Sequence, residues 1–160
     1  IRVLETLGLA HVKKTPPKLQ WGDVQPVANE QTLEALIVNR YEVMAGYARE
    51  LQRAVAQEIA RLPQQPADSV LKVARRWMHR DADKVPSWAS HSLEQARAVL
   101  PDADTMVRMR EELRQLWLST HRSRDQLASD LQAWCRRAEE SGIAALRDFS
   151  VKLRAVRQTA

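Results

Sequence analysis

The sequence predicts an all-α protein, an antiparallel helical bundle with one long N-terminal helix, and three observations support this fold class. The 160 residues include 22 alanines and 18 leucines, which favour helix, and only four glycines. All seven prolines lie within the first 101 residues, so no proline interrupts the last third of the chain. Apolar residues recur at the helical period over several long stretches.

The segment 1–28 is expected to be a short apolar stretch followed by an extended, proline-containing linker. Four of its residues, Lys13, Lys14, Lys18 and Trp21, combine positive charge with an amphipathic indole. This combination suits a membrane edge, and we expect these residues to contact a membrane surface. A Trp21 that caps the helical bundle is an equally good interpretation.

The segment 29–160 is expected to be one helical domain. Its first helix is predicted over about residues 30–62, where apolar residues from Leu33 to Leu62 recur every 3.6 residues or so. A helix of this length with one apolar stripe needs partner helices or a second copy of the chain. A homodimer through this helix is therefore a further expectation.

The segment 63–101 is expected to hold two short helices, separated by an irregular stretch over 79–90. Asp68 is placed to cap the first helix, and Pro86 and Pro101 bracket the second.

The last third, from Asp102 onward, is expected to form three helices with short connections, as in an antiparallel bundle. Ser123 with Gln126 three residues later matches a capping box that opens the second of these helices. Gly142 is placed to stop it before the third.

No local signature of catalysis or metal binding is present. No histidine has a second one at helical spacing, and the stretch from His79 to Asp83 has too few oxygen ligands for a cation site, so we interpret it as a polar loop. Cys135 has no disulfide partner in the chain, which favours a reducing compartment, and is interpreted as a small buried hydrophobe. The sequence therefore predicts no catalytic and no metal-binding residue.

The positive charge and the tryptophans both have simple interpretations. The formal charge of +5 falls mainly on the linker and on residues 103–160, among acidic neighbours, which indicates solvated helix faces more than a nucleic-acid footprint. Of the five tryptophans, Trp77, Trp117 and Trp134 fall on apolar stripes and are expected in the core.

The opening residues, Ile1 to Lys18, resemble the end of the catalytic domain of bacterial membrane-bound fatty acid desaturases. They contain a Leu-Gly-Leu-Ala segment followed by a basic, proline-containing exit. The remainder is similar to the C-terminal extension that some members of that family carry.

The desaturase resemblance implies a di-iron parent enzyme whose histidine boxes do not occur in this chain. Residues 1–28 would then end its catalytic domain. Residues 29–160 would be a non-catalytic domain for dimerisation, regulation or partner docking, on the cytoplasmic side of the inner membrane.

Two later stretches, Met106 to Trp117 and Trp134 to Arg154, are similar to a helical region of DDE-type insertion-sequence transposases. In those enzymes this region precedes the last catalytic acid, in a Gly-x-x-Glu type stretch that does not follow here, so no catalytic residue carries over. The resemblance implies the alternative function, a nucleic-acid-binding helical module. A third interpretation is an interaction module whose long helix self-associates.

Overall fold

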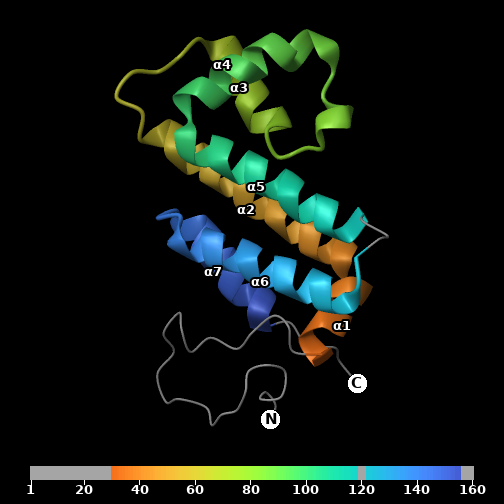
Figure 1. Ribbon diagram of the computed structural model, residues 1–160. Coiled ribbons are helices and arrows are strands. Elements are labelled where there is room, and N and C mark those ends of the chain that lie inside the picture. The colour runs from red at the N-terminus through yellow and green to blue at the C-terminus, as the bar shows by residue number, and fades with distance from the viewer. Residues whose placement is uncertain (1–29, 119–121, 156–160) are drawn as a thin grey trace. The chain divides into compact units, whose positions relative to one another are not determined.

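The computed structural model describes residues 30–118 and 122–155 (Figure 1). Within these ranges the regular elements are all helical, so the all-α fold class is confirmed. The predicted linker and membrane-edge residues Lys13, Lys14, Lys18 and Trp21 lie outside the described residues. No helix in the described ranges is long and apolar enough to span a membrane.

The chain divides into two compact units, and α2 and α5 each pass from one into the other. One unit contains the described residues of 1–43 and 113–160, and the other contains residues 44–112. In chain order the elements are α1 Glu30–Val38, α2 Arg40–Ala60, α3 Asp68–Trp77, η2 Ala82–Lys84, η3 Ser87–Ala89, α4 Ser90–Val99, α5 Pro101–Leu118, α6 Arg124–Glu140 and α7 Ala144–Ala155.

The stretch predicted as one helix over 30–62 consists of two helices separated at Asn39. Side chains there bond to the last carbonyls of α1. Asn39 Nδ2 donates to the Ala35 oxygen at 2.8 Å, and Arg40 Nη1 donates to the Ile37 oxygen at 2.8 Å. Polar side chains that bond to the backbone in this way compete with the regular helical pattern.

In the unit of residues 44–112, α2 and α5 lie side by side and antiparallel (Figure 1). The buried Tyr47 hydroxyl donates to the Met106 oxygen at 2.6 Å. Successive turns of α2 each bury one large apolar side chain in the chain's own core: Tyr47, Leu51, Val55 and Ile59. The apolar stripe that motivated a homodimer therefore has partners in its own chain, and the homodimer stays a prediction.

The N-terminus of α5 is capped by a side chain from α2. The Glu58 carboxylate accepts hydrogen bonds from the backbone N–H groups of Asp102, at 3.1 Å, and Ala103, at 2.9 Å. Pro101 has no N–H group to satisfy, so the carboxylate bonds to the next two donors of the helix. A negative charge at a helix N-terminus also interacts favourably with the helix dipole.

The short helices α3 and α4 pack against each other in the same unit (Figure 1). The predicted cap at Asp68 is wrong in detail, since α3 begins at Asp68 and the preceding Ala67 makes no side-chain cap. The stretch 79–90, predicted as irregular, contains only the two short 3-10 helices before α4 begins.

In the other unit, α6 and α7 pack against each other and run antiparallel. The predicted cap is confirmed, because the Ser123 hydroxyl accepts from the Gln126 N–H at 3.0 Å. The predicted stop at Gly142 is confirmed as well. Its φ of +80° is a left-handed conformation that turns the chain between the two helices.

Candidate nucleic-acid interface

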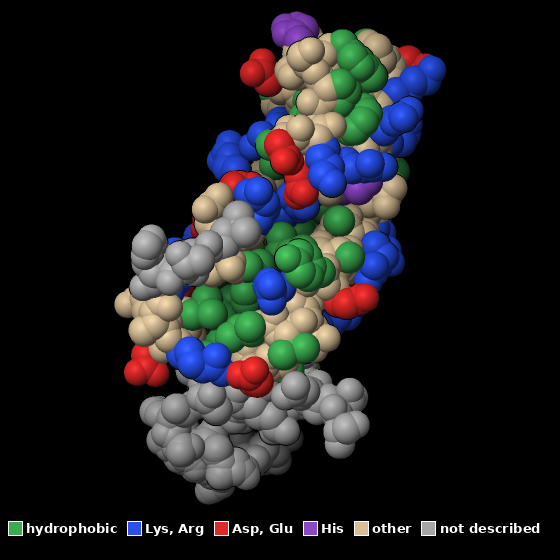
Figure 2. Space-filling model, turned by 90° about the vertical axis from the view of Figure 1, so that its right-hand side faces the viewer, with side chains coloured by type: hydrophobic (Ala, Val, Ile, Leu, Met, Phe, Trp, Pro, Cys, Tyr) green, Lys and Arg blue, Asp and Glu red, His purple; other side chains and the backbone are tan. Residues whose placement is uncertain are grey.

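Helix α3 is strongly amphipathic. Val70, Leu71, Val73 and Ala74 are buried, whereas the other side of the helix carries exposed basic residues. From Arg75 to Lys84 the chain has four Lys or Arg residues and two Asp residues. On the face drawn in Figure 2, Lys and Arg side chains are interspersed with exposed hydrophobic side chains. The end of α3 concentrates positive charge that the average over the whole chain conceals.

Two tryptophans meet at the end of α3. The ring centroids of Trp77 and Trp88 are 6.4 Å apart, and their planes are nearly perpendicular at 85°. Trp88 belongs to η3 and is 71% exposed, and the next residue, Ala89, is fully buried. The backbone of η3 is therefore anchored, while most of the Trp88 ring is exposed to solvent beside Trp77.

Two arginines stack on the first of these rings. Arg76 Cζ lies 5.2 Å and Arg80 Cζ 5.6 Å from the centroid of Trp77. Both distances are within the range of a cation–π interaction, which orients each guanidinium without neutralising its charge. We name Arg76, Trp77, Arg80 and Trp88 the tryptophan–arginine surface.

The positive charge of this surface is not cancelled by local acids. Among the described residues, no carboxylate forms an ion pair with Arg76 or Arg80. Asp81, the nearest acid in sequence, is instead paired with Arg110 of α5. That ion pair holds the start of the 79–90 stretch on α5 and leaves the two guanidinium groups free to bind an external anion.

His79 lies between Trp77 and Arg80 in the sequence, and its environment disfavours the charged imidazolium. Burial, together with the positive charges of Arg80 and Arg110, lowers its pKa below the ordinary value of 6.5. The predicted polar loop at His79, Asp81 and Asp83 thus contains an ion pair to α5. No three His, Cys, Asp or Glu side chains in the described ranges are placed to hold a metal ion.

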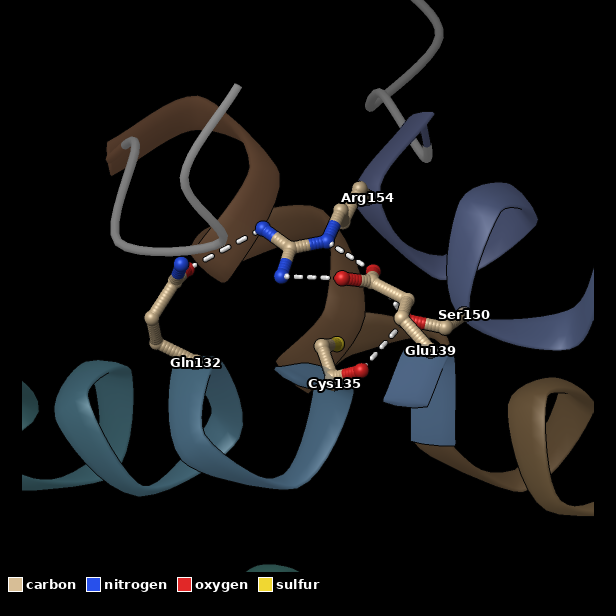
Figure 3. A network of polar contacts seen from close by, with 5 residues as sticks. All are labelled: Gln132, Cys135, Glu139, Ser150 and Arg154. Carbon is tan, nitrogen blue, oxygen red and sulfur yellow. Dashed lines mark hydrogen bonds and ion pairs between the residues drawn. The ribbon is translucent and has the colours of Figure 1, made fainter. Parts of the chain in front are cut away.

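A second polar cluster, in the other unit, is structural. The Glu139 carboxylate on α6 binds Arg154 and Ser150 of α7 in the interior (Figure 3). Cys135, one turn away, is fully buried as predicted, and burial raises the pKa of its thiol to about 11. A thiol with this pKa is protonated at neutral pH, which excludes a thiolate nucleophile at this position.

The three tryptophans that were expected in the core differ in how deeply they are buried. Trp134 is fully buried and packs edge-on against Phe149, with centroids 6.0 Å apart. Trp77 and Trp117 are only half-buried. Sequence reasoning assigned Trp77 to packing alone and gave Trp88 no role. The available signal was a tryptophan in an irregular, basic stretch, where core packing does not account for it.

A comparison with known protein families places the chain among transposases. The family model DDE_Tnp_ISL3, described as a transposase, matches residues 27–159. This range contains both stretches that resemble DDE-type transposases and nearly all of the domain attributed to a desaturase extension. No finding supports the desaturase interpretation. No curated protein and no solved structure matches the chain.

Proposed function

The chain belongs to the DDE_Tnp_ISL3 transposase family, and on this premise we propose that it is a helical DNA-binding module of a transposase. The tryptophan–arginine surface in residues 44–112 is the part that would contact DNA. The observation that carries the proposal is the pair of guanidinium groups, Arg76 and Arg80, oriented by an aromatic ring and not bound to any carboxylate among the described residues.

Phosphate groups suit this surface chemically. A guanidinium presents a planar set of donors that matches two phosphate oxygens, and it keeps its charge at every physiological pH. Because stacking on Trp77 already restricts both side chains, less conformational entropy is lost when a phosphate binds. The exposed basic side chains of Arg75, which precedes the surface in sequence, and Lys84, which lies between Arg80 and Trp88, extend the positive potential.

A salt titration tests the proposal. Binding of a fluorescein-labelled duplex of about 20 base pairs, followed by anisotropy between 50 and 200 mM salt, measures affinity and its salt dependence together. Each phosphate contact contributes about −0.9 to the slope of log affinity against log salt. The double variant Arg76→Ala/Arg80→Ala should therefore bind more weakly and show a slope smaller in magnitude by about 2.

A matched control removes the same charge elsewhere. Arg61 and Arg136 are exposed arginines without an ion pair in the described part of the chain, and Arg61→Ala/Arg136→Ala also lowers the charge by two. This control should leave most of the affinity and the slope unchanged. Equal losses of DNA affinity in both double variants would show that DNA is attracted by the positive charge of the whole chain and not by a defined surface. Absence of binding to this duplex and to single-stranded DNA at 50 mM salt would overturn the proposal.

A further inference from the structure

Packing in the core does not explain the position of Trp88, because most of its ring is exposed to solvent. Its ring is 71% exposed although η3, which carries it, is fixed by the buried Ala89. The planes of the Trp77 and Trp88 rings are nearly perpendicular at 85°, and the 71% exposure of Trp88 leaves most of its ring surface open to solvent. The open ring surface is available to a ligand with a flat apolar face, and the groups beside it decide which ligand fits.

The charge beside the ring defines the ligand further. Arg76 and Arg80 lie one ring away, over Trp77, and bind no acid of the described chain. A ligand that stacks on Trp88 and reaches these groups must carry negative charge next to a flat ring. A nucleotide with an accessible base meets both requirements, because base and phosphate are joined through one sugar.

We infer that Trp88 stacks on an unpaired base of DNA while Arg76 and Arg80 bind the adjoining phosphates. The inference rests on the proposed function and names its substrate: single-stranded or locally opened DNA in preference to a continuous duplex. In a duplex, the flat faces of the bases are covered by their neighbours, so only an unstacked base presents its face to the indole.

Tyr41 provides an internal comparison. It is 77% exposed, slightly more than Trp88, and the guanidinium of Arg40 lies 4.9 Å from its ring centroid. Arg40, however, already donates to the Ile37 oxygen at 2.8 Å. Tyr41 therefore lacks the uncommitted pair of arginines and serves as the matched control.

The experiment compares two single strands with identical phosphates, a 20-nucleotide oligothymidine and an abasic strand of the same length, using the 160-residue chain. The wild type should bind oligothymidine about tenfold more tightly than the abasic strand, as expected for stacking of a base. Trp88→Ala should remove this preference and leave the affinity for the abasic strand unchanged. Trp88→Phe should keep most of the preference, and Tyr41→Ala should keep all of it.

The outcomes separate the inference from the proposed function. Equal affinity of the wild type for both strands, or a preference lost in Tyr41→Ala and kept in Trp88→Ala, overturns the inference and leaves DNA binding intact. Failure to bind either strand or a duplex at 50 mM salt overturns both. If Trp88→Ala weakens binding to anionic lipid vesicles and not to oligothymidine, the ring contacts a membrane and the inference is wrong. The melting temperature of Trp88→Ala shows that the variant is folded.

Discussion

The Arg154 guanidinium and the Glu139 carboxylate form a bidentate ion pair inside the unit that contains α6 and α7 (Figure 3). Nε donates to Oε2 at 2.6 Å and Nη2 donates to Oε1 at 3.2 Å, and the two side chains are only 4% and 3% exposed. The Ser150 hydroxyl donates to Glu139 Oε2, and Arg154 Nη1 donates to the Gln132 side-chain oxygen. The pair fixes the register of α7 on α6.

Removing one member of this pair should be strongly destabilising. Glu139→Gln leaves the Arg154 charge buried without its counter-ion, and such changes cost about 3–5 kcal/mol. Urea denaturation of the 160-residue chain, followed by circular dichroism, measures the free energy of unfolding. The double variant Glu139→Met/Arg154→Met, which leaves no buried charge, should lose less than Glu139→Gln alone. A larger loss in the double variant would contradict this account of the pair.

Glu58 should stabilise α5 from outside that helix. Glu58→Ala removes the acceptor for the Asp102 and Ala103 N–H groups, and the expected cost is about 1–2 kcal/mol, as for loss of a helix cap. Thermal and urea unfolding measure the effect. Gln57→Ala, at an exposed neighbouring position on α2, should change stability by less than about 0.5 kcal/mol. Similar losses in the two variants would indicate an effect on α2 and none on the cap.

Local features of the sequence predicted the features of the fold that depend on nearby residues. The cap at Ser123 depends on a residue three positions later, and the stop at Gly142 depends on the backbone angle of a single residue. Both predictions are confirmed. In the cap of α5, Glu58 bonds to Asp102 and Ala103, which follow it by 44 and 45 positions in the sequence. No local pattern indicates a contact over that separation. The break at Asn39 was missed because apolar periodicity continues across it.

The candidate interface was missed for a related reason. Counting charges over long segments averages the basic end of α3 with distant acids, whereas the contacts of Arg76 and Arg80 with Trp77 are local. Periodicity placed Trp77 on an apolar stripe, and a stripe does not distinguish a buried ring from a half-buried one at its edge. The position of Trp88 against Trp77 depends on how the 79–90 stretch folds back, which no regular pattern specifies.

Stability should fall at alkaline pH through Cys135. Burial raises the pKa of its thiol from 9.0 to about 11, so the folded state binds the thiol proton more tightly than the unfolded state. The resulting stabilisation is fully present below pH 9 and is lost as the pH rises towards 11. Between pH 8.5 and 10.5 the wild type should lose about 2 kcal/mol more than Cys135→Ala.

The comparison of these two proteins isolates the thiol. Burial also raises the pKa of Tyr47, whose ionisation destabilises the fold in the same direction, but Tyr47 is present in both proteins and cancels in the difference. Urea unfolding at the two pH values measures the effect. Parallel losses in wild type and Cys135→Ala would show that the thiol ionises equally in the folded and unfolded states.

The same substitution at two glycines should have opposite effects. Gly142 has a φ of +80°, and a Cβ there meets no atom within 4 Å, so Gly142→Ala should cost about 1 kcal/mol through backbone strain alone. Gly46 lies inside α2, and a Cβ there approaches only the end of the Arg49 side chain, at 3.6 Å. Gly46→Ala should therefore stabilise the protein by about 0.5–1 kcal/mol. Urea midpoints measure both changes, and Gly142→Asn, which tolerates a left-handed conformation, should lose less than Gly142→Ala. Shifts of the same sign at both glycines would contradict the left-handed turn between α6 and α7.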